Sequence, residues 1–214
     1  MAQVPTGSTF YIASAYGSAK TVTIVTNATE AVVTAVAHGF SNGDVVEMTS
    51  GWGRLNKRHF EIESVLTDSF VLSGEDTTNT TFYPVGTGIG SVRKATTFTQ
   101  ITSVMNPQSS GGDPKTVTYK FVESDVEYSI NDGFGATSYT MELDADALGS
   151  AGYTALKSLT QVQTDTCLKV VTRSGSRVYQ PCTVALNESI RLQDGQINRV
   201  TCAFNGNNRL TRAS

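Results

Sequence analysis

The sequence predicts a mainly β protein, in which a larger β-rich body with one helix carries a small inserted module of short strands. Three observations support this prediction. Residues 31–74 hold several short strand patterns separated by tight turns. The chain before and after them alternates apolar and polar residues at the strand period, and only one segment has a helical stripe. Thr, Ser and Gly are abundant and only 16% of the residues are charged, which is typical of strands and turns.

Length, charge and cysteine spacing limit the classes of function. The 214 residues suffice for one medium domain and a small one. Sixteen Lys and Arg against 19 Asp and Glu give a net charge of −3, so a tightly held nucleic acid is not expected. We expect no signal peptide and no membrane segment, because no apolar run approaches the roughly 18 residues that a span needs. The widely spaced Cys167, Cys182 and Cys202 predict buried free thiols rather than disulfides or a zinc site.

The first part of the chain predicts the beginning of the body and then the module. Residues 10–16 and 21–25 are β-prone and are separated by Gly17-Ser18. Strand patterns in the module cover residues 32–36, 45–48, 60–65 and 70–72. A turn is predicted at residues 38–44, where Asn42-Gly43 accepts the positive φ of a tight turn. Four or five strands of this length can curl into a small barrel.

The chain then returns to the body through residues 79–90, a Thr- and Gly-rich linker. Residues 109–114 cannot continue a helix and lack apolar anchors, so we expect an exposed loop or hairpin arm there. Residues 116–123 alternate cleanly, which predicts a half-buried strand with one apolar face formed by Val117, Tyr119 and Phe121. A turn is predicted at Asp132-Gly133, followed by another strand at residues 139–143.

One helix is predicted, with its firm part at residues 153–163. Its apolar stripe consists of Leu148, Ala155, Leu159 and Val162. Asp144 or Asp146 is the expected N-terminal cap, and Gly149 and Gly152 weaken the first half of the helix.

Three β segments follow the helix, at residues 167–173, 177–186 and 197–204, with turns at Ser174-Gly175 and Asp194-Gly195. In the last of them, one face consists of Val200, Cys202 and Phe204. Residues 205–214 form a polar tail that carries Arg209 and Arg212.

No catalytic constellation is present, so we predict no catalytic residue, no cofactor and no metal site. The glycines at residues 86–90 superficially resemble a phosphate loop, but no helix follows them, and a linker is the better interpretation. His38 and His59 lack further ligands at metal-binding spacing, so hydrogen-bonding or surface roles are expected. Asp144 and Asp146 fit a helix cap better than a calcium loop.

Two features leave alternatives open. The acidic cluster of Glu123, Asp125 and Glu127 is either a solvated loop or a surface that faces another polyanion. Trp52, the only tryptophan, lies between Gly51 and Gly53, which either expose it or let backbone approach it closely. It is therefore a candidate exposed contact of the module for a sugar or a partner, or a lid that packs over the barrel.

Residues 38–44, HGFSNGD, are followed at characteristic spacing by Asn56, Phe60, Ile62, Phe70 and Leu72. This pattern resembles a small β-barrel module first named in ubiquitin-activating enzymes, where it belongs to the first catalytic-cysteine half-domain, and repeatedly seen in phage structural proteins. Lys57 stands where the pattern has Gly. The resemblance implies a decorating module and no ubiquitin chemistry.

The remaining chain is similar to the major tail tube proteins of long, non-contractile-tailed (siphovirus) phages. The similarity rests on the order of residues 99–104, the loop after Met105, the strands at 116–123 and 139–143, the helix around residues 152–156 and the closing hairpins. It implies a β-sandwich tail-tube fold with one flanking helix. It further implies that six subunits form a ring, that inner sheets join edge to edge, and that the rings stack into a tube through which the genome is delivered.

Together these observations predict a body of residues 1–26 and 95–214, with a module and its linkers at residues 27–94. Stacking contacts are expected at Ser109, Ser110, Gly111, Gly112, Asp113, Pro114, Asn207 and Arg209. The expected partners are further copies of the chain and other tail proteins such as the tape measure, tail terminator and tail tip, while DNA passes without specific binding. The expected location is the virion tail, assembled in the host bacterial cytoplasm. The alternative is a tail-tip or adhesin-like protein whose barrel, around Trp52, recognises a host-surface glycan; an enzyme is not expected.

Overall fold

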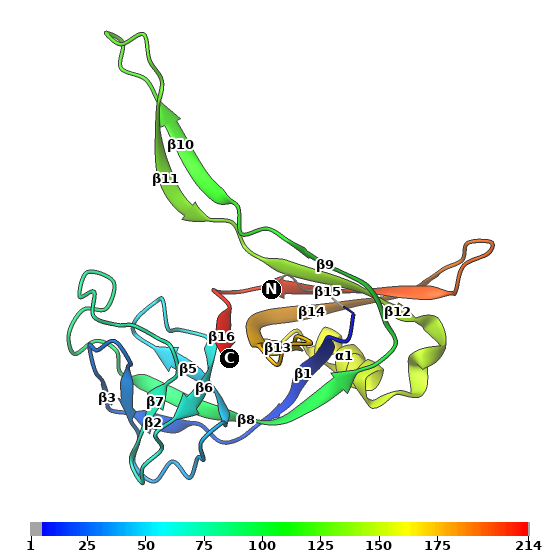
Figure 1. Cartoon of the computed structure of the whole chain (residues 1–214), viewed down its shortest axis with the longest axis horizontal. Coiled ribbons are helices and arrows are strands. Elements are labelled where there is room, and N and C mark those ends of the chain that lie inside the picture. The colour runs from blue at the N-terminus through cyan, green and yellow to red at the C-terminus, as the bar shows by residue number, and fades with distance from the viewer. Residues whose placement is uncertain (1–5, 214) are drawn as a thin grey trace.

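The computed structural model of the chain describes residues 6–213, and about half of them lie in β-strands. Figure 1 shows a small barrel at one end, a curled sheet beside a helix, and a long two-stranded arm that leaves the sheet. The predicted mainly β class is confirmed, with one α-helix in the described part of the chain. No helix among residues 6–213 is long and apolar enough to span a bilayer.

The small barrel is a closed circuit of antiparallel strand pairs. Its strands are β2 (Lys20–Val22), β3 (Ile24–Val25), β4 (Val32–Thr34), β5 (Val45–Ser50), β6 (Arg58–Glu63), β7 (Ser69–Leu72) and β8 (Gly90–Ile101). The pairs run from β3 to β4, β7, β6, β5, β8 and β2, and only Thr23 separates β2 from β3. Because the circuit closes, these short strands leave no long unpaired edge.

The body is a curled antiparallel sheet that begins with the second part of β8. Its further strands are β1 (Thr9–Tyr16), β9 (Val104–Ser110), β12 (Ser138–Asp144), β13 (Thr166–Val171), β14 (Arg177–Arg191), β15 (Arg199–Gly206) and β16 (Thr211–Ala213). Their order is β8-β1-β13-β14-β15-β12-β9, and β16 pairs with the beginning of β14. Within β8, Lys94 still pairs with the barrel, whereas Ala95 pairs with Tyr16 of β1.

Each part has its own buried core. In the body, the sheet and the helix bury a cluster that includes Ile12, Met141, Leu143, Leu156, Leu168, Val200, Cys202 and Phe204. In the barrel, the cluster includes Val22, Val25, Val33, Met48, Trp52, Leu55, Phe60, Ile62, Phe70 and Leu72. A third, small cluster of Ala13, Val45, Ala95, Cys167 and Tyr179 lies where the two parts meet. All three cysteines are buried and free, as the sequence predicts.

The helix α1 (Ala151–Val162) follows a short 3-10 helix, Ala145–Gly149. Each has its own cap. Asp144 accepts a hydrogen bond from the Asp146 amide (3.0 Å), so the predicted aspartate cap belongs to the 3-10 helix. The hydroxyl of Ser150 accepts a hydrogen bond from the Tyr153 amide (3.2 Å) and caps α1.

The buried face of α1 differs from the predicted stripe. Leu148 and Val162 are 56% and 61% exposed, while Gly152, Tyr153 and Leu156 are buried. The reason is the close approach of α1 to β8. A Cβ atom at Gly152 would lie 2.4 Å from the carbonyl oxygen of Gln100, so only glycine fits there. The glycine that weakens the helix pattern is the residue that lets the helix dock.

The arm consists of β10 (Pro114–Tyr119) and β11 (Tyr128–Phe134), which form a separate two-stranded sheet. The turn predicted at Asp132-Gly133 is wrong. Both residues lie within β11, and the positive φ of Gly133 (83°) coincides with a shift in strand register between Pro114 and Thr116. The turn of the hairpin lies instead at residues 120–127.

The turn before β6 keeps its shape without glycine. Lys57, which stands where the module pattern has Gly, adopts a φ of 61°, in the left-handed region. Its amide donates a hydrogen bond to the Met48 carbonyl oxygen over 2.7 Å.

Candidate assembly surfaces

The residues expected to make stacking contacts, Ser109 to Pro114, form the root of the arm. Ser109 and Ser110 end β9, and the Ser110 hydroxyl lies 2.8 Å from that of Ser138 in β12. Gly111 and Gly112 follow with φ values of 79° and 78°, and Pro114 begins β10. A Cβ atom at Gly111 would lie 2.0 Å from the carbonyl oxygen of Ala136, so the chain passes this point only with glycine. Of the two predicted alternatives, the structure has the hairpin arm.

The arm has one apolar and one polar face. Val117 pairs directly with Ile130, and Tyr119 with Tyr128. Side chains at alternate positions of a strand point to the same face, so these four residues share one side of the hairpin. The residues between them, including Thr116, Thr118 and Ser129, occupy the other side.

Three aromatic rings gather on the apolar face. Tyr119 stacks against Tyr128 with ring centroids 5.4 Å apart, and Phe121 meets both rings edge-on at 5.4 and 5.9 Å. Such arrangements stabilise the hairpin by roughly 0.5–1.5 kcal/mol per pair. These ring contacts also hold the three side chains together on the outer surface of the molecule.

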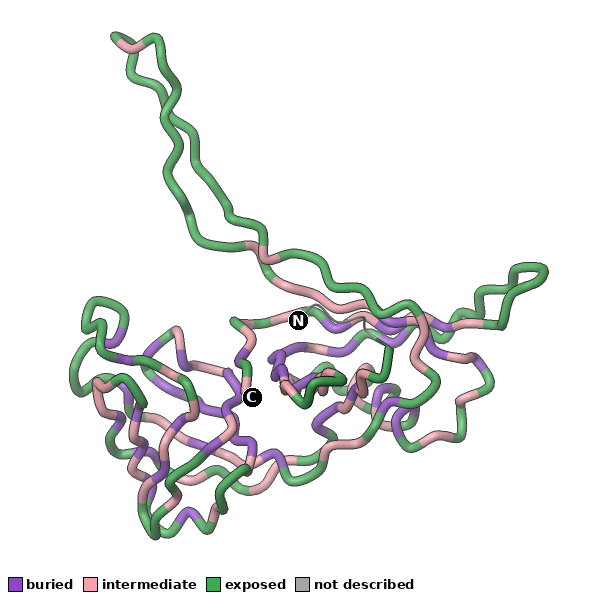
Figure 2. The backbone as a smooth tube through the Cα atoms, in the orientation of Figure 1, coloured by how far each residue is buried: buried purple, intermediate pink, exposed green. Residues whose placement is uncertain are grey.

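This apolar face is uncovered within the subunit. Val117 and Phe121 are each 53% exposed, and Figure 2 shows the arm exposed along nearly its whole length. The predicted half-burial of residues 116–123 is therefore wrong for the single chain. The alternation of the sequence is real, but no other segment in the described part of the chain packs on the apolar side.

The turn of the arm is acidic. Glu123, Asp125 and Glu127 all lie at or next to it, and none of them forms an ion pair within residues 6–213. An exposed position at the arm tip is compatible with both alternatives for this cluster, a solvated loop and a surface that faces another polyanion.

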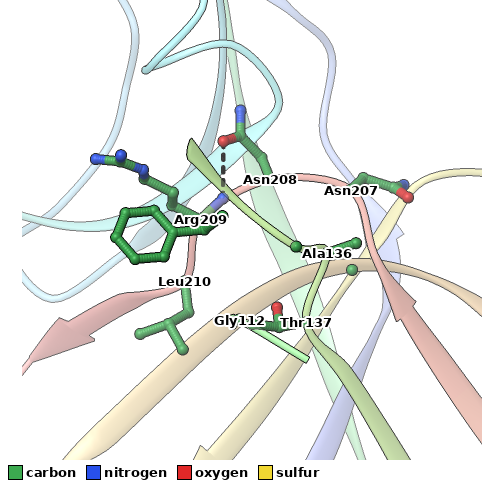
Figure 3. Close-up of a pocket in the computed structure, with 10 residues that line it drawn as sticks. Gly112, Ala136, Thr137, Asn207, Asn208, Arg209 and Leu210 are labelled. Carbon is green, nitrogen blue, oxygen red and sulfur yellow. Dashed lines mark hydrogen bonds between the residues drawn. The ribbon is translucent and has the colours of Figure 1, made fainter. Parts of the chain in front are cut away.

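Two predicted contact segments meet at the arm root. Gly112, Ala136 and Thr137 line a pocket together with Asn207 and Arg209 of the C-terminal segment (Figure 3). The Gly206 amide donates a hydrogen bond to the Thr137 carbonyl oxygen (2.8 Å), which fixes the segment there.

The C-terminal segment is not a free polar tail. Thr211 pairs with Tyr179 through β16, and the Asn208 side chain donates hydrogen bonds to the Gly53 (3.3 Å) and Asn56 (2.7 Å) carbonyl oxygens of the barrel. Asn207 donates to Asp165 over 2.6 Å. Asn207 and Arg209 were both predicted to make stacking contacts. Of the two, only the Arg209 side chain lacks such a hydrogen bond among the described residues.

The expectation that Trp52 is an exposed contact is wrong. Its side chain is 1% exposed, and its indole Nε1 donates hydrogen bonds to the Pro84 carbonyl oxygen (2.8 Å) and the Thr87 hydroxyl (2.9 Å). Tyr83 meets the ring edge-on at 5.2 Å, and Gly88 lies so close that a Cβ atom there would be 2.9 Å from it. The predicted linker, residues 79–90, therefore packs over Trp52 as a lid.

Polar contacts join the barrel to the body. Glu61 of β6 accepts a hydrogen bond from the Tyr179 hydroxyl (3.0 Å) and lies 3.1 Å from the Arg177 guanidinium, both on β14. Burial, together with the Glu61 carboxylate, raises the pKa of Tyr179 above its usual range. The hydroxyl therefore stays protonated and remains a donor.

A second group of contacts lies on β5, β6 and the turn between them. Glu47 of β5 is almost fully buried and, within the barrel, accepts a hydrogen bond from Arg93 Nε of β8 over 2.6 Å. Lys57 lies 3.4 Å from Asp165 in the body. His59 Nε2 lies 2.8 Å from the Tyr16 hydroxyl. Burial, with a smaller effect of Arg93 and Lys57, lowers the pKa of His59 to about 3, so its ring is neutral at pH 7.

The sequence did not identify these contacts. His59 was expected to have a hydrogen-bonding or surface role, and the structure places it in the first of these, while His38 accepts a hydrogen bond from the Phe40 amide through Nδ1 (3.0 Å). Glu47 and Glu61 carry no motif. Their only signal is a carboxylate at an inward or partly inward position of a strand.

Comparison with known proteins identifies a family. A family model described as phage tail tube protein matches residues 50–214. Among solved structures, the tail of an empty gene transfer agent (GTA) particle, computed with helical refinement in C6 symmetry, is similar at 12% identity and a TM-score of 0.44, over 55% of this chain and 87% of that chain. The virion of a native GTA particle is similar at 14% identity and a TM-score of 0.38, over 55% and 89%. No curated protein matches.

Proposed function

This chain belongs to the phage tail tube protein family and is a structural subunit of a tail tube, and on that premise we propose that six copies form a ring and that rings stack into the tube that delivers the genome. The observation that carries the proposal is the arm, whose aromatic face is uncovered in the single chain. An isolated two-stranded hairpin is at best marginally stable in water, and contiguous exposed apolar patches mark contact sites. A further copy of the chain that covers this face accounts for its composition.

The body supplies an edge for closing a ring. β9 is the last strand of the sheet and pairs only with β12, so its other side is unpaired within the described residues. An unpaired edge invites addition of a strand from another chain. When that strand comes from a neighbouring copy at a fixed rotation, the contact repeats and closes into a ring.

We propose that the barrel is an inserted module that projects outward from the tube, with boundaries near residues 27 and 94. The change of pairing partner between Lys94 and Ala95 supports the second boundary. Val22 and Val25 belong to the barrel core, so the packing of the module begins a few residues before its proposed start. The likeness to the module of ubiquitin-activating enzymes is part of this proposal and rests on residues 38–72 alone.

The remaining details follow from the same proposal. The tube belongs to a siphovirus-type tail, assembled in the host bacterial cytoplasm, and its ends meet the tape measure, tail terminator and tail tip proteins. DNA passes through the lumen without being held, which the net charge of −3 permits. The adhesin alternative has no support from Trp52, because that residue is buried. A structural family favours a protein without enzymatic activity.

Replacing residues 113–134 with a short turn tests the proposal. We expect the intact protein to form tubes with sixfold rings in negative-stain electron micrographs. The shortened protein should keep the circular dichroism spectrum of a folded β protein and sediment as a monomer or single ring. Tubes formed equally well without the arm would contradict its role, and discrete trimers of the intact protein would contradict the function itself.

A further inference from the structure

A groove on the body combines an apolar lining with two arginines. It lies at one end of the curled sheet and has a volume of 630 Å³. Its apolar lining comes from four different strands and consists of Phe10, Tyr139, Val170 and Val178. Two arginines, Arg173 and Arg212, also line it. Neither guanidinium forms an ion pair within the described residues.

The arm of the same chain cannot fill this groove. Pro107, Gln108 and Ser109, which lead into the arm, form one wall of the groove. From that wall the arm runs outward, away from the body (Figure 1). The arm of the same chain therefore leaves the groove uncovered.

The surfaces match in their apolar character. The groove offers aliphatic and aromatic side chains, and the arm presents Tyr119, Phe121 and Tyr128 as a preformed aromatic cluster. Aromatic residues that insert into apolar pockets commonly dominate the binding energy of an interface. Because the rings already pack against one another, little conformational entropy is lost when they dock.

The charges match as well. The arm tip carries Glu123, Asp125 and Glu127, and the groove lining includes Arg173 and Arg212; none of these five forms an ion pair among the described residues. Unpaired charges of opposite sign at the two ends of a contact favour the correct register and penalise others.

We propose that the aromatic face of the arm docks into the groove of another copy in the next ring, with the acidic tip against Arg173 and Arg212. This inference rests on the proposed function and adds the receiving site to it. The contact is heterologous, since arm and groove are different surfaces, and each copy uses both. A contact of this kind repeats without end along the tube axis unless another protein covers the last groove.

Charge reversal tests the pairing. In one variant, Glu123→Lys, Asp125→Lys and Glu127→Lys are combined; in a second, Arg173→Glu and Arg212→Glu; in a third, all five. We expect each of the first two to raise the concentration needed for tube formation by about tenfold or more, because like charges then face each other. The variant with all five reversals should form tubes at a concentration within about threefold of that of the parent protein.

Two control variants separate this effect from a general change of charge. Lys20→Glu and Glu30→Lys both alter charges of the barrel, outside the arm and the groove; neither residue forms an ion pair among the described residues. Both should assemble like the parent. The thermal unfolding midpoints of all variants should agree within a few degrees, which shows that the subunits are folded.

Cross-linking locates the contact. The native thiols are buried and burial raises the pKa of each, so they stay unreactive and an introduced pair reacts alone. With Val122→Cys, at a fully exposed position of the arm turn, and Ser174→Cys on the same chain, oxidised tubes should give a ladder of covalent oligomers. Two results would overturn the groove assignment while leaving the tube function intact. One is that the variant with all five charge reversals assembles no better than the two partial variants, and the other is that tubes form without this ladder. An efficient link between Ser174→Cys and Ala2→Cys of one chain would assign the groove to the chain's own N-terminus and overturn the proposal. Failure of the parent protein to form tubes would overturn the function first.

Discussion

The hydroxyl of Tyr179, in the body, donates a hydrogen bond to Glu61 Oε2, in the barrel, over 3.0 Å. Arg177 approaches the other oxygen of the same carboxylate at 3.1 Å. With the hydrogen bonds of Asn208 to the barrel backbone, these contacts hold the barrel against β14 and β16. These contacts therefore fix the orientation of the barrel relative to the body.

Glu61→Ala should lower the free energy of unfolding by about 1–3 kcal/mol, since a half-buried network loses its shared acceptor. Glu63→Ala, an exposed carboxylate on the same strand, is the matched control and should change it by less than about 0.5 kcal/mol. Urea unfolding monitored by circular dichroism measures both. Equal effects of the two variants would show that the contact between barrel and body contributes nothing to stability.

Stability should fall as the pH falls, through His59. Its pKa is lowered to about 3 in the folded chain, whereas the unfolded chain binds the proton near 6.5. The stabilisation is fully present above pH 6.5 and is lost as the pH decreases toward 3, by up to about 1.4 kcal/mol per pH unit. His59→Gln should flatten this dependence between pH 6.5 and 4. An unchanged slope in the variant would mean that other groups cause it.

The helix depends on a single glycine. Gly152→Ala should destabilise the chain by about 1–3 kcal/mol, because the new methyl group meets the Gln100 carbonyl oxygen. Gly149→Ala is the control: open space surrounds that position, and alanine is no worse than glycine in a helical turn. The thermal unfolding midpoints of the two variants should shift in opposite directions or differ by several degrees. If both are neutral, the helix does not approach β8 as described.

Trp52 should behave as a core residue. Trp52→Ala should cost about 3–5 kcal/mol of unfolding free energy, the range for large aromatic truncations in cores. Val85→Ala, in the exposed part of the segment that covers the indole, should be nearly neutral. Because Trp52 is the only tryptophan, its fluorescence should be blue-shifted and poorly quenched by iodide in the intact protein. Strong quenching would restore the exposed-contact interpretation.

Much of the fold follows from local pattern. Strands and turns of the barrel, the β segments after the helix and the inward residues Val200, Cys202 and Phe204 all follow from alternation and turn chemistry. The pairing of β16 and the position of residues 205–213 do not follow from local pattern. This segment is polar and of ordinary composition, and it gains its order from long-range contacts with Gln180 and the barrel.

The arm shows why burial is harder to predict than strand structure. Residues 116–121 alternate like any half-buried strand, and alternation specifies an apolar face without saying which molecule covers it. Trp52 shows the converse: flanking glycines are compatible with exposure or with close backbone approach, and only the fold of residues 79–90 over the ring decides between them.

An electron cryomicroscopy map of tubes assembled from the intact protein would show whether another copy covers the arm. We expect stacked rings in which β10 and β11 of every subunit lie against another copy, with the face of Tyr119, Phe121 and Tyr128 buried between them. A tube in which this face points into solvent, or a protein that forms no tube under any assembly condition, would contradict this expectation.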